Sequence, residues 1–174
     1  PPAADQAGGG ERRRRGGGGG GGGFGGGDTP REKYQFVVLC LDRASGKTLW
    51  QKTVREEVPH EGHHRDHGFA SASPVTDGKM LYAFFGSRGL YCYTLAGELI
   101  WKRDFGQMKG LNRFGEGSSP TLAGDKLIVP WDHIGPSALY ALNKRTGEIL
   151  WKQDRDELTC WATPCCGSRS CAVR

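Results

Sequence analysis

The sequence predicts an all-β fold, part of a β-propeller whose blades are four-stranded antiparallel sheets. One phrase occurs three times: an apolar run, a tight glycine turn, and a second apolar run that reaches Trp. In every copy Trp follows Gly by four residues, at Gly46 and Trp50, Gly97 and Trp101, and Gly147 and Trp151. Phrases that recur together at a nearly constant period indicate a repeat architecture.

A second phrase, Ser or Thr followed by Pro, recurs out of phase with the first, at Pro74, Pro120 and Pro164. Short apolar runs separated by Gly and Asp turns fill each repeat without helical periodicity, which is the pattern of propeller blades. A meandering β-sandwich has turns at a similar spacing. The matching Gly-to-Trp spacing in three units favours the propeller over that alternative.

The individual strands follow from the apolar runs between turns. Phe36 to Leu41 is rich in β-branched residues and is expected to be a buried strand, with a partner strand over residues 47–54. Asp77-Gly78 is a hairpin signal, because both residues tolerate positive φ. The strands expected on either side of it are Ala70 to Thr76 and Met80 to Phe85. The expected units are a partial blade 34–55, a blade 69–105, a blade 117–154 and the start of a further blade 159–164.

The two ends of the chain differ from these repeats. Residues 1–33 are a low-complexity Gly/Arg segment that is expected to be disordered, and residues 165–174 are an off-pattern tail. The run Arg12 to Arg15 supplies four positive charges of a net charge of +5, so nucleic-acid binding through this segment is a second, weaker alternative. The chain does not begin with Met and shows no signal-peptide pattern, and we expect it to be a fragment. It has no apolar stretch long enough for a transmembrane helix.

Two cysteines occupy matching positions in the repeats. Cys40 and Cys92 stand where Ala141 stands in the third copy. This equivalence predicts small, buried packing residues, which is the common role of free Cys.

These phrases resemble the pyrroloquinoline-quinone-type (PQQ-like) β-propeller repeat, whose unit contains Ala-x-Asp-x-x-Thr-Gly-x-x-x-Trp. The matching residues are Cys40, Asp42, Ser45, Gly46 and Trp50 in one copy, and Ala141, Asn143, Thr146, Gly147 and Trp151 in another. The middle copy is one residue shorter and has Thr94 at the Asp position. The resemblance covers about residues 36–164 and is greatest to bacterial propellers of the outer-membrane assembly lipoprotein type.

The resemblance implies structural roles for the recurring residues. Trp50, Trp101 and Trp151, with Gly46, Gly97 and Gly147, are expected to dock neighbouring blades. The function that it implies is a non-catalytic binding or scaffolding module, periplasmic or otherwise in the cell envelope. We expect a protein or small-molecule partner at the mouth of the propeller.

The alternative is a fragment of a dehydrogenase that depends on PQQ and calcium. Calcium takes six to eight oxygen ligands, and the sequence shows no such constellation. Cys165-Cys166 is a vicinal pair, but its surroundings do not match the vicinal disulfide of these enzymes. No catalytic residue and no metal site are therefore assigned, and PQQ and calcium are cofactors only under this alternative.

The connections between blades are the expected ligand-binding surface, because loops on a rigid scaffold commonly carry function. The candidate residues are His60, His63, His64 and His67 in the first connection, and Arg113 and Glu116 in the second. The His spacing fits no defined metal site, so pH dependence near neutrality is expected rather than metal binding. Arg113 and Glu116 are candidates to hold a carboxylate or a sugar. His133, in a loop of the next blade, is expected at a different edge and facing solvent.

Overall fold

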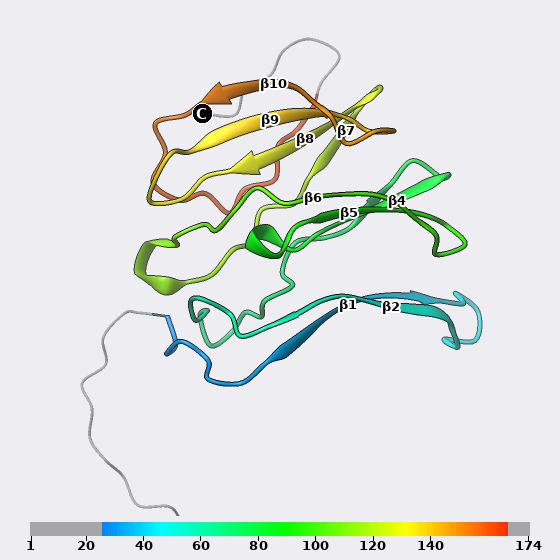
Figure 1. Ribbon diagram of the computed structural model, residues 1–174, viewed down its shortest axis with the longest axis horizontal. Coiled ribbons are helices and arrows are strands. Elements are labelled where there is room, and N and C mark those ends of the chain that lie inside the picture. Colours follow the sequence, from blue (N-terminus) through cyan, green and yellow to red (C-terminus); the bar gives the residue numbers. More distant parts are fainter. Residues whose placement is uncertain (1–25, 167–174) are drawn as a thin grey trace, which may run out of the picture.

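The computed structural model describes residues 26–166, which form three antiparallel sheets stacked in chain order (Figure 1). The first sheet pairs β1 (Tyr34–Leu41) with β2 (Thr48–Glu57). The second contains β3 (Val75–Thr76), β4 (Met80–Phe84), β5 (Leu90–Thr94) and β6 (Leu99–Arg103) in that order. The third contains β7 (Thr121–Ala123), β8 (Lys126–Trp131), β9 (Ala138–Asn143) and β10 (Ile149–Asp154). The all-β fold class predicted from the sequence is confirmed.

Only two short 3₁₀ turns interrupt the strands of the described residues, η1 (Gly86–Arg88) and η2 (Leu111–Arg113). Between residues 26 and 166 there is no helix of the length and apolar character that a membrane span requires. The run Arg12 to Arg15 and most of the expected low-complexity segment lie outside the described residues, as does the tail from residue 167.

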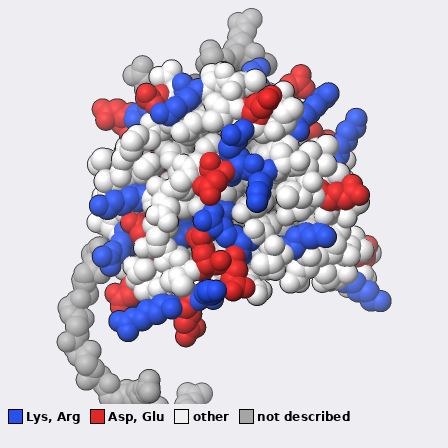
Figure 2. All heavy atoms as spheres, viewed as in Figure 1, with Lys and Arg blue, Asp and Glu red and all other residues white. Residues whose placement is uncertain are grey.

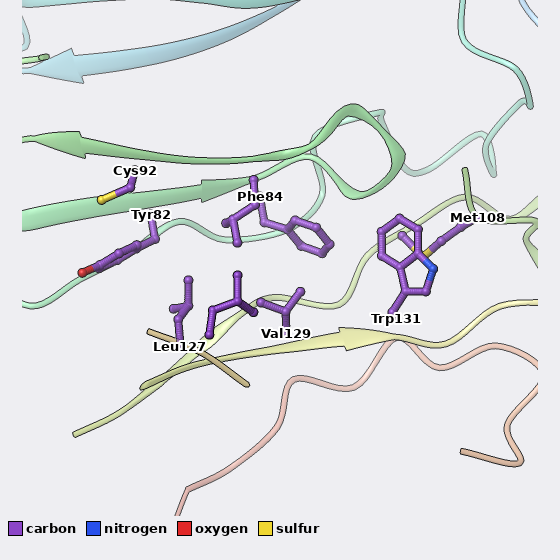
Figure 3. Close-up of a cluster of buried hydrophobic side chains, with 9 residues drawn as sticks. Tyr82, Phe84, Cys92, Met108, Leu127, Val129 and Trp131 are labelled. Atoms are coloured by element: carbon purple, nitrogen blue, oxygen red, sulfur yellow. The ribbon is translucent and has the colours of Figure 1, made fainter. Parts of the chain in front are cut away.

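The core lies between the sheets, because the second sheet is apolar on both of its faces. Side chains alternate across a strand, so Tyr82 and Phe84 of β4 face the third sheet while Ala83 faces the first. Figure 3 shows Tyr82 and Phe84 opposite Leu127 and Val129 of β8. The second sheet therefore contributes to two cores at once, and its stability depends on both neighbours.

Each sheet also contacts the next through a Trp and a glycine turn. The indole N–H of Trp50 in β2 donates to the carbonyl of Leu95, 2.9 Å away, and Trp101 in β6 donates to Lys144 at 3.0 Å. A Cβ on Gly97 would lie 2.8 Å from the Trp50 ring, and one on Gly147 would lie 2.6 Å from Trp101. The ring thus occupies the space that a side chain would fill.

The outer members of this series have no such neighbour among the described residues. A Cβ on Gly46 would meet no atom within 4 Å, and the Trp151 side chain is 41% exposed. The positive φ of Gly46, +68°, is still required by its turn. In the part of the chain that the structure describes, the docking contact occurs twice.

Residues of the Ser/Thr-Pro phrase form hydrogen bonds from one repeat to the next. The backbone N–H of Ser73 donates to the hydroxyl of Ser119 at 2.9 Å, and the N–H of Ser119 donates to the hydroxyl of Thr163 at 3.4 Å. The hydroxyl of Thr121 donates to the carbonyl of Pro164 at 2.6 Å. Residues one repeat apart are therefore bonded directly, which explains why a hydroxyl residue precedes each proline.

Three expectations about the strands need correction. β3 begins only at Val75, not Ala70, because the N–H of Ser73 is directed to the next sheet and Pro74 has no N–H to donate. β1 is not buried throughout: Leu39 and Leu41 are 48% and 49% exposed, since no described sheet covers that face. Cys40, on the opposite face of β1, is half-buried, whereas the equivalent Cys92 and Ala141 are fully buried.

The Trp contact yields a prediction about stability. Trp101→Ala should lower the free energy of unfolding by about 3 kcal/mol, because a packed ring and its hydrogen bond are lost. Trp151→Ala is the matched control and should cost about 1 kcal/mol or less, because its ring is partly exposed. Urea unfolding measures both values. Equal losses for the two variants would contradict a docking role for Trp101.

A second prediction concerns Asp77, in the turn between β3 and β4. Hydrogen bonds from the backbone at Met80 and the nearby ammonium of Lys144, 2.9 Å away, lower the pKa of Asp77 to about 2. A carboxyl with a lowered folded pKa stabilises the protein above its unfolded pKa, and this stabilisation is lost as pH falls from about 4 towards 2. Asp77→Asn keeps an acceptor oxygen but cannot titrate.

The urea midpoint of the unmodified chain should therefore fall more steeply between neutral pH and pH 2 than that of Asp77→Asn. At neutral pH the variant should be the less stable of the two. Parallel pH profiles would show that Asp77 does not link the two sheets through its charge.

Candidate functional site

Two long segments connect the sheets, and both lie at the same end of the stack (left in Figure 1). They are residues 58–74, between β2 and β3, and residues 104–120, between β6 and β7. The turn at η1 and the β8–β9 turn, residues 132–137, are at this end too, because antiparallel strands alternate in direction. We call the surface made by these four segments the loop face.

The two connecting segments are bonded to each other along this face. The N–H of His64 donates to the carbonyl of Phe114 at 3.1 Å. The N–H of Gly110 donates to the Glu61 carboxylate at 2.9 Å. These bonds hold the two segments in one arrangement.

Arg88 lies buried beneath the loop face, and its side chain is only 3% exposed. Its Nη1 lies 3.1 Å from the Glu116 carboxylate and its Nε lies 3.3 Å from that of Glu57. The guanidinium carbon is 5.5 Å from the ring centre of Phe36 and 5.3 Å from that of Phe69, within cation–π range. A buried cation is thus paired with one carboxylate from β2 and one from the segment between β6 and β7.

Glu116 is held by more than Arg88. The N–H and hydroxyl of Ser87 donate to its two carboxylate oxygens at 2.6 and 2.5 Å. The Ser87 hydroxyl oxygen also accepts from the N–H of Met108 at 2.7 Å. These contacts fix residues 104–120 against η1. Breaking them is costly, because removing one partner of a buried ion pair leaves an uncompensated charge.

His60 completes this cluster. Its Nε2 lies 2.7 Å from the carbonyl oxygen of Met108, and since a carbonyl only accepts, Nε2 carries the hydrogen. Its Nδ1 is then free to accept from Arg88 Nη2, 3.5 Å away. The ring is therefore used inside the loop face rather than presented to a ligand.

The other three loop histidines do not converge with it. His63 packs edge-on against Phe69, with ring centres 4.5 Å apart, and His64 packs in the same way against Phe114 at 5.4 Å. His67 is exposed. Within residues 26–166 no three His, Cys, Asp or Glu side chains are grouped so that they could hold a metal ion.

The remaining sequence candidates have different environments. Arg113 is exposed and has a left-handed backbone, φ +57°, while Glu116 is bound to Arg88. The expectation that His133 faces solvent is wrong: it is 7% exposed, and its Nδ1 accepts from the N–H of Lys109 at 3.3 Å. The error arose because the β8–β9 turn shares the loop face with the segment that holds Lys109.

Arg88, Ser87 and Glu57 were not among the sequence candidates. The composition of residues 86–89, Gly-Ser-Arg-Gly, is that of an ordinary exposed turn. The burial of Arg88 could therefore not be predicted from these residues alone. A usable signal was the position of Arg88 between two strongly apolar strands, where a charged residue needs a partner.

The carboxylates of the loop face do not fit a calcium and quinone site. Glu57 and Glu116 pair with Arg88, and Asp132 pairs with Arg155 at 2.9 Å. Burial raises the pKa of Asp132, and Arg155 opposes that shift. Calcium needs six to eight oxygen ligands, whereas these oxygens are distributed over separate arginine pairs. On the side of the stack that faces the viewer, Figure 2 shows basic and acidic side chains interspersed.

Comparison with known proteins places these features in one family. A family model described as outer membrane protein assembly factor BamB matches residues 35–173. No curated protein matches the sequence.

Several solved structures match part of the chain at low similarity. BamB from Moraxella catarrhalis has 13% identity and a TM-score of 0.42, covering 67% of this chain and 30% of that one. A europium-containing methanol dehydrogenase has 14% identity and a TM-score of 0.45, covering 68% and 21%. Quinohemoprotein alcohol dehydrogenase from Comamonas testosteroni has 14% identity and a TM-score of 0.45, and the match covers 68% of this chain and 18% of that one. The chain spans less than a third of the length of each.

The Arg88 cluster predicts strong coupling between its members. Arg88→Met should lower the free energy of unfolding by about 3 kcal/mol, because it leaves two carboxylates without their buried cation. In Arg88→Met/Glu116→Gln the loss should be at least about 1 kcal/mol smaller than the sum of the single losses. Arg65→Met, at a side chain 88% exposed, is the control and should change stability by less than about 0.5 kcal/mol. Additive losses in urea unfolding would contradict the coupling.

Proposed function

Because the chain belongs to the PQQ-like repeat family of the outer membrane protein assembly factor BamB type, we propose that it is a non-catalytic β-propeller module that binds a protein partner through its loop face. The observation that carries this proposal is the Arg88 cluster. Through His60 and Phe69 on one side and Glu116 on the other, it ties residues 58–74 and 104–120 together from below. It leaves outer residues of both segments exposed, among them Arg65, Asp66, His67 and Leu111.

A surface held in this way suits protein recognition. Association has to overcome the loss of loop and side-chain freedom, and a pre-organised surface has less of that freedom to lose. The exposed residues include both charges, an imidazole and one apolar side chain, the mixture found at the polar rim of many interfaces. A protein partner suits this broad surface better than a small molecule, which is usually enclosed in a pocket.

The family description also supports a location and a type of partner. We infer that the module works in the cell envelope and that its partner takes part in the assembly of outer membrane proteins. The rival hypothesis, a PQQ- and calcium-dependent dehydrogenase, makes a different prediction: calcium-dependent binding of PQQ, measured by equilibrium dialysis. The arginine-paired carboxylates described above favour the binding module.

The proposal predicts where a partner can be crosslinked. A photo-reactive amino acid at Arg65, on the loop face, should crosslink to one defined envelope protein in cells. The same group at Asp125, an exposed turn residue at the opposite end of the strands, is the matched control and should not. Crosslinking of the same protein from Asp125 alone, or from neither position, would refute the loop face as the binding surface.

A further inference from the structure

A short glycine segment crosses the loop face just before β1. The N–H of Gly26 donates to the carbonyl of Asn112 at 2.6 Å, and the N–H of Gly27 donates to the carbonyl of His63 at 2.8 Å. Successive residues thus bond to opposite sides, one to each of the two connecting segments. Gly26 belongs to the segment that the sequence predicts to be disordered, but it is half-buried and lies between the connections.

The fit at this place excludes side chains. A Cβ on Gly26 would overlap the carbonyl group of Arg113, and a Cβ on Gly27 would lie 3.2 Å from the His63 carbonyl oxygen. Gly62 is buried below the segment, and a Cβ there would overlap the carbonyl of Gly27. The surrounding walls therefore accept backbone alone.

The two residues that contact Gly26 on one side, Asn112 and Arg113, have an unusual backbone conformation. Asn112 and Arg113 have φ values of +54° and +57°, in the left-handed region that non-glycine residues rarely adopt. Such conformations persist where the surrounding structure imposes them and concentrate at ligand-binding positions. Here the two residues with this conformation are the ones that contact Gly26. The carbonyl of Asn112 accepts the Gly26 N–H, and the carbonyl of Arg113 lies against the Cα of Gly26.

We propose that Gly62–His63 and Asn112–Arg113 form a groove that recognises an extended, glycine-containing peptide through its backbone, and that residues 26–28 of this chain occupy it in cis. The recognition is a form of peptide insertion by backbone hydrogen bonds, in which affinity comes from the main chain and selectivity comes from side-chain space. The selectivity here is for glycine, because a Cβ at the position of Gly26 would overlap the carbonyl group of Arg113. This inference deepens the proposed function, since it names the kind of segment that the loop face accepts.

Occupation in cis gives the groove a regulatory consequence. A tethered segment competes at a high effective concentration with any peptide supplied by a partner. A partner segment therefore binds only when it displaces residues 26–28.

The first arm of the test is amide hydrogen exchange on the full chain. In the unmodified protein the Gly27 amide should be protected, and in Gly26→Val its protection should fall at least tenfold. Gly68→Val is the matched control from the same connecting segment, since a Cβ there meets nothing within 4 Å, and it should leave Gly27 protected. An unprotected Gly27 amide in the unmodified chain, or unchanged protection in Gly26→Val, would overturn occupation in cis.

The second arm uses a synthetic peptide of residues 26–33, Gly-Gly-Asp-Thr-Pro-Arg-Glu-Lys. At millimolar concentration it should shift the amide resonances of His63, His64 and Arg113 in Gly26→Val, where the groove is vacant. The unmodified chain should need at least tenfold more peptide. Gly26→Val/Gly62→Ala, which also obstructs the groove from below, should show no shifts.

Each outcome of this arm decides the proposal. Absence of shifts in Gly26→Val, or equal shifts when Gly62 is also replaced, would overturn recognition by the groove. Crosslinking from Arg65 does not depend on residues 26–28, so it would still test the proposed function after the groove had failed.

Discussion

The contact between a Trp ring and the glycine turn of the next sheet is the interaction on which the structure depends. A four-stranded sheet with two apolar faces cannot remain isolated in water, so every sheet needs neighbours at a fixed distance and angle. The ring of Trp101 fixes the position of the third sheet relative to the second, because its face packs on Gly147 and its N–H donates to the carbonyl of Lys144. The cores on either side of β4 lie between sheets that are aligned in this way.

The loop face is a consequence of the same alignment. Arg88 belongs to the second sheet, but Glu57 comes from the first sheet and Glu116 from the connection to the third. The guanidinium of Arg88 can face both counter-ions only when the three sheets are in register. Hydrophobic residues of similar volume often give equal or greater stability than such a cluster. We therefore regard positioning of the two connections as its main contribution.

The glycine segment before β1 adds a second layer to this surface. The cluster around Arg88 holds the connections from below, whereas Gly26 and Gly27 bridge them from above through Asn112 and His63. The two layers use different physics. The lower one depends on charge in a dry environment, and the upper one depends on backbone hydrogen bonds at a place where side chains do not fit. A partner that replaces the upper layer would leave the lower one intact.

The sequence alone determined the repeat, the all-β class and the family, because periodic Gly, Trp and Ser/Thr-Pro residues are properties of single units that need no neighbour to be seen. It also identified the two connecting segments of the loop face, but not the turns at η1 and between β8 and β9 that share it. The roles of individual loop residues were decided only by tertiary structure: Arg88 appeared to be a turn residue, His133 appeared exposed, and Gly26 appeared to be part of a linker. Burial and charge pairing in these cases depend on residues from other sheets, and a one-dimensional pattern does not contain those distances.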